Sequence, residues 1–471
     1  MATGEEQVIV RLVAEVDKYV VSDEPLELPA KLTRYGLSEL VNHLLGQQPP
    51  VPFDFLADGE LLRTSLHKFM QLRSLNGEAT LELRYFPLVR EPEKVTEHVH
   101  ADWISALASR RSDGAILTGS YDGVARLFSA VDLANPSDPV HALCVFDAHP
   151  SPLKCVSFVE SGANLGSSAD GTLAVLATGS LDGGLRVWLA SGDGRASCVC
   201  VCAAHEGSVE ALSSFSAPGS GVVQLASGSR DGTVCVWDAS EKVGEYRKSL
   251  DAPARKIQVK EFVDGKKRRK ASAASSEEAA ERVAPPPAHL SPVSVLRAHS
   301  QPVTGVQWAG SETLVSSSWD GAMHVWDVRT AQRTHTVGGL KAIQSFALSS
   351  ASESGAVQMP ASLLAATGHD NGAVQLWDVR AKPSEAAAAK LLSHSTWVSA
   401  LAFSETSEFL LLSASHDQTV KMWDIRGKLP LHSLDVHTDK VLAACWGGTD
   451  GGAIISGGAD ARLLVHALPS S

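Results

Sequence analysis

Apolar and polar residues alternate along most of this chain, and the alternation falls into one phrase that returns seven times after residue 110. Each copy has a short alternating run, a tight turn with Asp and Gly, and a second run that ends in an aromatic residue, as from Val222 to Trp237. Such runs predict β-strands joined as hairpins. A period of about 40 residues is typical of four-stranded propeller blades. We therefore predict an all-β propeller with seven blades.

Polar residues recur at fixed places within the phrase. A hydroxyl residue is followed four places later by Asp and six places after that by an aromatic residue, and a His precedes most copies. Because a catalytic Ser-His-Asp site is needed once per chain, a set that recurs in nearly every copy predicts a structural hydrogen-bonding network instead. Four copies carry the complete set: His149, Thr178, Asp182, Trp188, His205, Ser227, Asp231, Trp237, His299, Ser316, Asp320, Trp326, His394, Ser413, Asp417 and Trp423.

The first, fifth and seventh copies depart from this pattern. Phe128 and His466 stand where Trp is expected, Asn371 replaces Asp, and Gly338-Gly339-Leu340 occupies the place of the fifth His. We expect those blades to depend more on packing than on the polar network. The segment Glu93 to Val99 is expected to pair with the last blade and close the ring, which removes exposed sheet edges.

Residues 1–90 lack the repeat and follow another pattern. Leu37, Leu40, Val41, Leu44 and Leu45 form one apolar stripe of helical period. The order of expected elements predicts a small α+β, ubiquitin-like domain. Around the helix we expect strands at Gln7–Val13, Tyr19–Val21, Val51–Leu56 and Ala79–Phe86, and a short helix at Ser65–Leu72.

The propeller is expected over residues 91–468, with a foreign insert at 241–290 between the third and fourth blades. The insert is rich in Ala, Ser, Glu and Pro, with little apolar surface to bury, and is expected to be disordered. It contains the basic run Lys266, Lys267, Arg268, Arg269 and Lys270. We favour a nuclear import signal there, with contact to ribosomal RNA or mere solubility as alternatives.

Composition narrows the possible functions. The chain has 471 residues and a net charge of -12, which disfavours a protein that mainly wraps nucleic acid. No stretch of about 20 apolar residues occurs, and the start lacks signal-peptide features, so we expect a cytosolic or nuclear protein. Cys198, Cys200 and Cys202 alternate on one expected strand, where packed thiols are favoured over a metal site. His43 and His67 have no partner at ligand spacing and receive no function.

Two resemblances follow from these residues. The repeats, with Trp-Asp pairs at 237–238, 326–327, 377–378 and 423–424, resemble the WD-repeat family, whose fold is a seven-bladed β-propeller. The strings from Arg34 to Leu45, Pro52 to Leu56 and Gly59 to Leu66 resemble the Notchless-like (NLE) domain. Together they resemble the NLE-domain WD-repeat ribosome-biogenesis proteins of the complex with Pescadillo and the block-of-proliferation protein (the PeBoW complex).

This resemblance implies a non-enzymatic scaffold for maturation of the large (60S) ribosomal subunit and its rRNA, in the nucleolus and nucleoplasm. It implies that the propeller meets the propeller of the block-of-proliferation protein within the pre-60S particle. It further implies that the midasin AAA ATPase captures the NLE domain, and that Glu78 completes a metal site on midasin in trans. No cofactor is expected in the chain itself.

Two other functions remain open at this point. A hydrolase in the central channel would need a unique cluster of acidic or His residues, a Walker-type loop or metal-ligand spacing. A generic WD-repeat adaptor or ubiquitin-ligase substrate receptor is the alternative to ribosome biogenesis. Co-purification with ribosomal precursors or with ligase subunits separates the last two.

Overall fold

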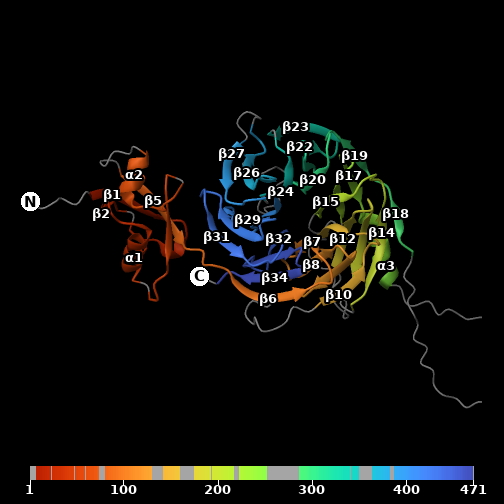
Figure 1. Cartoon of the computed structure of the whole chain (residues 1–471), viewed down its shortest axis with the longest axis horizontal. Coiled ribbons are helices and arrows are strands. Elements are labelled where there is room, and N and C mark those ends of the chain that lie inside the picture. The colour runs from red at the N-terminus through yellow and green to blue at the C-terminus, as the bar shows by residue number, and fades with distance from the viewer. Residues whose placement is uncertain are drawn as a thin grey trace, which may run out of the picture.

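A computed structural model shows a ring of β-sheets with a smaller domain beside it (Figure 1). The structure describes residues 7–22, 24–46, 48–58, 60–73, 80–129, 142–159, 174–191, 194–216, 222–251, 286–339, 341–349, 363–381 and 387–469. Seven antiparallel meanders make up the ring, as the repeat predicts, and the seven-bladed propeller is confirmed. Within the described ranges, no helix combines the length and the apolar character needed to cross a membrane.

The first four blades follow one another along the chain. Blade one contains β7 (Ile104–Ser109), β8 (Ile116–Ser120), β9 (Val124–Phe128) and β10 (Ala142–Asp147). Blade two contains β11 (Leu153–Phe158), β12 (Ala174–Ser180), β13 (Leu185–Ala190), β14 (Ala196–Cys202) and an added strand, β18 (Ala288–Leu290). Blade three contains β15 (Val209–Phe215), β16 (Gln224–Ser229), β17 (Thr233–Asp238) and β19 (Ser294–Arg297). Blade four contains β20 (Val303–Trp308), β21 (Thr313–Ser318), β22 (Ala322–Asp327) and β23 (Gln332–Gly338).

The last three blades complete the ring. Blade five contains β24 (Ile343–Leu348), β25 (Leu364–His369), β26 (Ala373–Asp378) and β27 (Ala387–Leu392). Blade six contains β28 (Val398–Phe403), β29 (Leu410–Ser415), β30 (Thr419–Asp424) and β31 (Pro430–Asp435). Blade seven contains β32 (Val441–Gly447), β33 (Ala453–Gly458), β34 (Arg462–Ala467) and β6 (Glu93–Val99).

Ring closure depends on β6, which comes before blade one in the chain but belongs to blade seven. It pairs antiparallel with β34, from Val99 opposite Arg462 to Glu93 opposite Ala467. The expected closing strand is therefore confirmed. Because it supplies the outer strand of the last blade, the first and last repeats are joined by backbone hydrogen bonds.

Neighbouring blades pack face to face through small and branched side chains. The second strand of each blade is buried along nearly its whole length, as in β8, β12 and β33. Gly228 shows why the hydroxyl residue is followed by glycine, because a Cβ there would lie 2.6 Å from the Val303 side chain of the next blade. This glycine lets the innermost strand of blade four approach closely.

The two ends of the insert expected at 241–290 are ordered, so the expectation of disorder is wrong there. Helix α3 (Ser240–Asp251) buries Val243 and Tyr246 against blades two and three. After the segment 252–285, which lies outside the described residues, β18 pairs parallel with β14. One end packs apolar side chains against the propeller, and the other pairs its backbone with a propeller strand. The polar composition of the middle of the insert gave no indication of either contact.

The amino-terminal domain is a five-stranded mixed sheet covered by one longer helix. Its strands are β1 (Gln7–Ala14), β2 (Leu26–Pro29), β3 (Phe53–Ala57), β4 (Glu60–Leu61) and β5 (Leu81–Pro87), with η1 (Asp17–Tyr19), α1 (Arg34–Leu45) and α2 (Leu66–Arg73). β1 runs parallel to β5 at the centre of the sheet. Leu37 and Val41 of the predicted stripe are fully buried under α1. The ubiquitin-like order of elements is confirmed.

One element of this domain differs from the expectation. The second strand is β2, at 26–29, whereas residues 17–19 form a short 3-10 turn. Tyr19 is needed in the core, where its ring lies 5.3 Å from that of Phe53 and its carbonyl accepts a hydrogen bond from the Tyr85 hydroxyl at 2.6 Å. The apolar residues near position 20 therefore fill the core and do not extend the sheet.

Candidate functional site: blade networks and the domain junction

Blade six shows the complete polar network. The indole N–H of Trp423 donates to the Ser413 hydroxyl at 2.8 Å, and that hydroxyl lies 2.7 Å from His394 Nε2. The other nitrogen of the same imidazole, His394 Nδ1, lies 2.9 Å from Asp417. Four side chains from the start of the blade, two strands and a turn are thus joined in one chain of hydrogen bonds.

The direction of this chain follows from the charge states. An ionised carboxylate can only accept, so Nδ1 carries the proton and donates to Asp417, which leaves Nε2 to accept from Ser413. Burial lowers the pKa of His394 and keeps the imidazole neutral. Burial opposes ionisation of Asp417, but hydrogen bonds from Thr419 and the interaction with His394 outweigh it and lower its pKa to about 2. The carboxylate is charged at neutral pH and the histidine is not.

The same four residue types come together in three other blades, but only blade four repeats the direct His-to-Asp hydrogen bond: His205 Nδ1 lies 3.1 Å from Thr233, and His149 Nδ1 has no hydrogen-bond partner among the described residues. In blade four, His299 lies 2.9 Å from Asp320 and 2.8 Å from Ser316, which accepts from Trp326 at 2.8 Å. In blade three, His205 Nε2 lies 2.7 Å from Ser227, Trp237 donates to the same hydroxyl at 2.9 Å, and Asp231 is 3.4 Å from Nδ1. In blade two, the corresponding distances from His149 are 3.1 Å to Thr178 and 3.5 Å to Asp182, with Trp188 at 3.0 Å from Thr178. The structure brings together all sixteen residues of the four complete sets.

This Ser-His-Asp order is also the order of a catalytic triad, but its surroundings differ. Ser413 and Ser227 are 0% exposed, so no substrate carbonyl can reach their oxygens. Each hydroxyl also accepts an indole N–H, which reduces its capacity to act as a nucleophile. The arrangement is suited to holding strands together.

The three divergent blades behave differently from one another. In blade one, His100 finds no hydrogen-bond partner among the described residues, and its ring stacks on Phe128 at 5.8 Å. The expectation of packing in place of hydrogen bonds is confirmed there. It is wrong for blade seven, where His437 lies 2.8 Å from Ser456 and 3.0 Å from Asp460, although both ring nitrogens of His466 lack a partner within the described ranges.

Blade five also keeps a polar network, by a substitution that the sequence interpretation missed. His369, two residues after Thr367, lies 3.1 Å from the Thr367 hydroxyl, which accepts from Trp377 at 2.7 Å. Its other ring nitrogen donates to the Ala342 carbonyl at 2.9 Å. The signal was a His inside the strand, where the repeat usually has Ser. His369, inside the second strand, therefore bonds the Thr367 hydroxyl in place of the upstream histidine that this repeat lacks.

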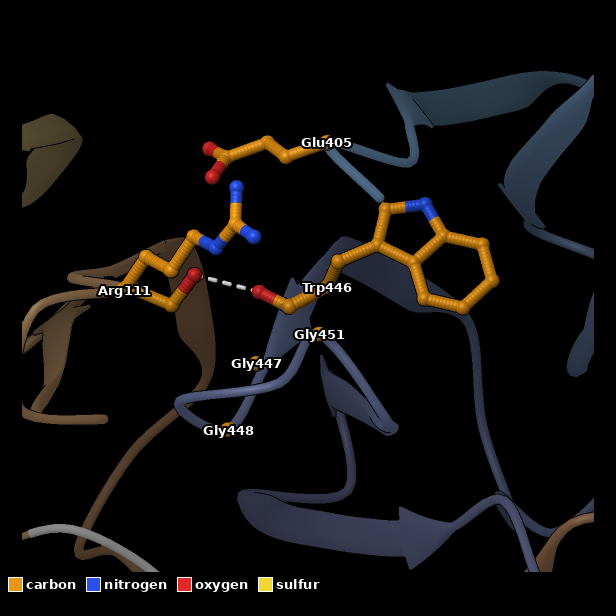
Figure 2. Close-up of a pocket in the computed structure, with 7 residues that line it drawn as sticks. Arg111, Glu405, Trp446, Gly447, Gly448 and Gly451 are labelled. Atoms are coloured by element: carbon orange, nitrogen blue, oxygen red, sulfur yellow. Dashed lines mark hydrogen bonds between the residues drawn. The ribbon is translucent and has the colours of Figure 1, made fainter. Parts of the chain in front are cut away.

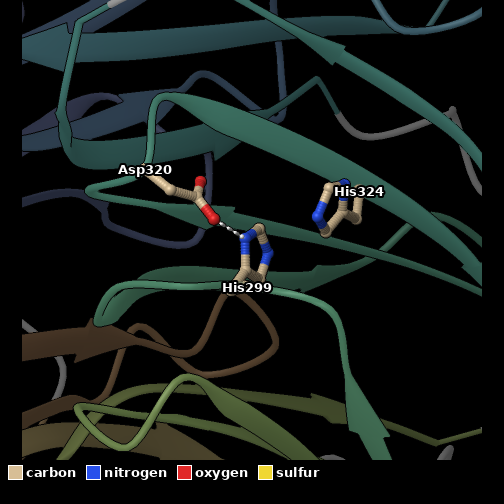
Figure 3. A group of neighbouring side chains, drawn as sticks. All are labelled: His299, Asp320 and His324. Carbon is tan, nitrogen blue, oxygen red and sulfur yellow. Dashed lines mark hydrogen bonds and ion pairs between the residues drawn. The ribbon is translucent and has the colours of Figure 1, made fainter.

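Three potential metal ligands lie together in blade four, His299, Asp320 and His324 (Figure 3). The two imidazole rings stack at 4.1 Å with an angle of 19°. Because metal ligation uses the lone pair in the plane of each ring, stacked rings direct their lone pairs alongside each other and not toward one point. Three of the four ring nitrogens are also engaged: His299 Nδ1 bonds Asp320, His299 Nε2 lies 2.8 Å from Ser316, and His324 Nδ1 lies 3.0 Å from Thr336. The group is structural.

The three alternating cysteines lie on β14, where Cys200 and Cys202 are buried and Cys198 is half-buried. Burial raises the pKa of Cys200 to about 11 and also raises the pKa of Cys198 and Cys202. Cys200 and Cys202 pack in the core between blades two and three, whereas Cys198 packs against the core between blades one and two. The three thiols therefore lie in two different cores, as packed side chains do.

A small recess lies where blades six, seven and one meet (Figure 2). Arg111, Glu405, Trp446 and neighbouring glycines line it, and the Ser109 hydroxyl donates to the Trp446 carbonyl at its base. Its volume of about 10 Å³ suits about one water molecule. The recess is too small for an organic substrate.

Two of the predicted sites lie outside the described residues. Glu78 belongs to the segment 74–79, between α2 and β5. The basic run Lys266 to Lys270 belongs to the segment 252–285, between α3 and β18. Both remain predictions.

One important residue was not recognised in the sequence. Arg426, in the turn after β30, forms an ion pair with Glu15 of the amino-terminal domain at 2.9 Å. Its signal in the sequence is a Trp-Asp-x-Arg string that blades four and five share. Only the tertiary structure brings Glu15, 411 residues away, to this arginine.

Comparison with known proteins agrees with both parts of the fold. Residues 8–70 match the NLE (NUC135) domain, and residues 141–188, 196–238, 290–327 and 388–424 match the WD domain, G-beta repeat. A "Ribosome biogenesis protein WDR12 homolog" of Chlamydomonas reinhardtii is 34% identical, covering 98% of this chain and 98% of the relative. The chain belongs to the NLE-domain WD-repeat family of ribosome biogenesis proteins.

Members of this family from distant organisms align along nearly the whole chain. A relative of the same name in Arabidopsis thaliana is 30% identical over 97% of this chain and 95% of its own length. The "Ribosome biogenesis protein YTM1" of Candida glabrata is 32% identical over 99% of this chain and 98% of its own. These relatives therefore align with both the NLE domain and the propeller of this chain.

Proposed function

We propose that this protein is a non-enzymatic assembly scaffold required for maturation of the large (60S) ribosomal subunit and its rRNA. The observation that carries the proposal is the match to ribosome biogenesis proteins along nearly the whole chain, across both its NLE domain and its propeller. The geometry supports a scaffold, because the recurring Ser-His-Asp sets of the complete blades have buried, indole-bonded hydroxyls. The protein acts in the nucleus, in the nucleolus and nucleoplasm.

The NLE domain is proposed as the part that the midasin AAA ATPase captures for release of the protein from the pre-60S particle. Glu78 supplies a carboxylate to a metal ion held by midasin. The chemistry is suitable because Mg²⁺ prefers hard oxygen ligands in an octahedral shell and usually leaves positions open for a partner. A carboxylate bound to a metal resists displacement better than one in an exposed ion pair.

A binding measurement with matched variants tests the role of Glu78. Glu78→Gln keeps the size of the side chain and removes its charge, so we expect capture of the full-length protein by midasin to weaken at least about tenfold. Glu82→Ala, an exposed glutamate on β5 of the same domain, is the control and should bind as the wild type does. Chelation of divalent ions should abolish wild-type capture. Undiminished capture of Glu78→Gln contradicts the proposal.

The propeller is proposed to dock on Pescadillo and the block-of-proliferation protein. Three exposed tryptophans indicate which face of the propeller docks. Trp103, Trp319 and Trp397 are 45%, 37% and 47% exposed. In blades one, four and six, all three take part in a backbone contact between the residue just before the innermost strand and the turn that joins the second and third strands. Exposed tryptophans are frequent anchors of protein interfaces. They therefore mark this face of the ring for a partner protein.

Charge on this face favours a protein over RNA. Arg230 lies 6.0 Å from the Trp319 ring. The exposed cations of this face, Arg230, Lys341 and Lys440, are balanced by the exposed acids Glu206, Asp370 and Asp439, so the face lacks the excess of cations that phosphates require. Replacing both Trp103 and Trp397 by Ala should reduce co-purification of the block-of-proliferation protein at least about tenfold. Val145→Ala, exposed on the outer edge of blade one, is the control. Co-purification of ligase subunits instead would support an adaptor function.

The basic run in the insert is proposed as a nuclear import signal, with rRNA contact as the alternative. The insert is held at both ends, by α3 and by β18, on the side of the ring opposite the NLE domain (Figure 1). Residues 252–285 fused to a fluorescent reporter should bring it into the nucleus, and changing the five cations to Ala should leave it cytoplasmic. A cytoplasmic reporter with the native segment refutes the import signal.

A further inference from the structure

The turn between β30 and β31 of blade six contains an arginine, Arg426, that contacts both domains. The Nε and Nη2 groups of Arg426 donate to the two oxygens of Asp424, at 3.0 and 2.8 Å. Its remaining nitrogen, Nη1, donates to both carboxylate oxygens of Glu15, at 2.9 and 3.0 Å. Every nitrogen of the guanidinium group is therefore engaged, on one side by the propeller and on the other by the NLE domain.

Aromatic rings from both domains also contact this group. The guanidinium carbon lies 4.6 Å from the ring centroid of Phe86, at the end of β5, and 4.0 Å from that of Phe409, before β29. The Ile425 N–H donates to the Phe409 carbonyl at 2.9 Å, which fixes that ring beside the turn. Each domain thus supplies one carboxylate and one ring, and cation–π contact adds to the ion pairs. We call Arg426, Asp424, Glu15, Phe86 and Phe409 the clasp.

The propeller's charged side of the clasp is largely removed from water, whereas Glu15 is 26% and Phe409 37% exposed. The side chains of Arg426 and Asp424 are 15% and 2% exposed. Burial alone would lower the pKa of Arg426, but hydrogen bonds and charge from Asp424 and Glu15 outweigh it and raise that pKa. The neighbouring pair Lys428 to Glu60, at 3.3 Å, differs because Lys428 is 82% exposed, and such pairs contribute little. Of the two ion pairs between the domains at this turn, the one made by Arg426 is therefore the stronger.

The connecting segment is fastened on both sides of the junction. The Leu88 N–H donates to the Pro52 carbonyl of the NLE domain at 2.8 Å. His432 Nε2 of β31 lies 2.9 Å from the Val89 carbonyl, and Val89 packs against the core between blades six and seven. These bonds leave only a short free linker, about which the NLE domain could still rotate, and the clasp is a second point of attachment that opposes this rotation.

We propose that Arg426 fixes the NLE domain in one orientation on blade six, so that the two domains move as one rigid unit. Two domains joined by a short linker and a small interface ordinarily move relative to each other. The clasp removes that motion. Its mechanical consequence rests on the proposed function, because a pull on the NLE domain then reaches the propeller without first extending a loose joint.

Blade four supplies an internal comparison for the arginine. Arg329 follows Trp326 and Asp327 as Arg426 follows Trp423 and Asp424, and it is exposed at the edge of the ring. An arginine at this position of a blade therefore does not require a contact with the NLE domain. Arg329→Ala is the matched control for Arg426→Ala.

The distance between the domains, measured in the full-length protein alone, tests the clasp. Spin labels placed through an introduced keto amino acid at Tyr35 of α1 and Val293 of blade three, both strongly exposed, should give one narrow distance distribution. We expect Arg329→Ala to preserve it, and Arg426→Ala to broaden it at least about twofold. Glu15→Ala removes the same contact from the other domain and should broaden it equally, which guards against a folding defect in the blade. A broad wild-type distribution, or unchanged widths in both variants, refutes the clasp.

A second measurement separates the clasp from the proposed release. Arg426→Ala should leave capture by midasin intact while slowing ATP-dependent removal of the protein from isolated pre-60S particles, whereas Glu78→Gln should lose capture itself. If Arg426→Ala is removed as fast as the wild type, the mechanical consequence is wrong even where the distances support the clasp. If wild-type protein is not captured, the proposed function fails and the distance result still stands.

Discussion

Blades six and one have the same fold but are stabilised differently, by hydrogen bonds in blade six and by aromatic packing in blade one. In blade six, His394, Ser413, Asp417 and Trp423 form a continuous chain of hydrogen bonds. In blade one, the corresponding His100 has no hydrogen-bond partner among the described residues, and its ring contacts those of His98 and Phe128, at 5.3 and 5.8 Å. The second strand is equally buried in both blades.

The difference teaches that the polar network is one means of fastening a blade and not a condition for its fold. Blade one lies beside β6, whose His98 ring meets Phe128 at 4.9 Å. Losing the indole removes the donor for the Thr118 hydroxyl, and aromatic packing occupies the space instead. The cost is a buried imidazole without a partner, which makes blade one more sensitive to protonation.

The largest expected contrast comes from removing the two histidines. His394→Leu removes two interior hydrogen bonds, one of them to the ionised Asp417, so we expect the free energy of unfolding to fall by about 3–4 kcal/mol. His100→Leu removes an unpartnered polar group and should change it by less than about 1 kcal/mol. Urea titration followed by tryptophan fluorescence measures both. Equal losses would show that His100 has a partner in solution.

Removing the hydroxyl groups should give a smaller contrast. Ser413→Ala strands the Trp423 N–H and His394 Nε2 in the interior, at a cost of about 2–3 kcal/mol. Thr118→Val keeps the shape and removes only a 3.4 Å contact to the Arg126 carbonyl, so we expect a cost below about 1 kcal/mol. Thermal unfolding compares the two. A Thr118 variant as unstable as the Ser413 variant breaks the comparison.

Acid should reveal the unpartnered histidines. Burial lowers the pKa of His100 and His466 to about 4 in the folded protein, against about 6.5 in the unfolded chain. The unfolded state therefore takes up protons first, and stability present above pH 6.5 is lost as the pH falls toward 4. By pH 5 each group should cost on the order of 1–2 kcal/mol. His100→Leu should flatten the pH profile, and an identical profile argues against this origin.

The smallest effect is expected in blade five. Asn371→Asp restores the usual turn residue, but the place of the upstream His is taken by glycine and Leu340, so the new carboxylate gains no imidazole. Asn371 is exposed, and we expect a change within about 0.5 kcal/mol. A clearly stabilised variant would show that His369 can turn toward it. The melting temperature of the purified protein suffices as the readout.

Much of this fold could be predicted because the same pattern of residues recurs in each repeat. Period-2 alternation, the turn residues and the recurring polar set predicted the meanders, the pairing of His with Ser and Trp, and the closing strand β6. The helix stripe from Leu37 to Leu45 predicted α1 in the same way. Failures came where a residue had two possible uses. Tyr19 fills the core instead of extending the sheet, and His369 substitutes for a histidine that the repeat lacks.

The sequence by itself determined which strands form, which face of each is buried and how often the unit recurs, because those depend on contacts between residues close in the chain or one repeat apart. Only the tertiary structure decided where the NLE domain rests and which arginine holds it. Arg426 and Arg329 occupy the same place in their repeats, yet one is clasped by Glu15 and Phe86 and the other faces solvent. The physical reason is that a contact between residues 411 positions apart leaves no periodic trace in the chain.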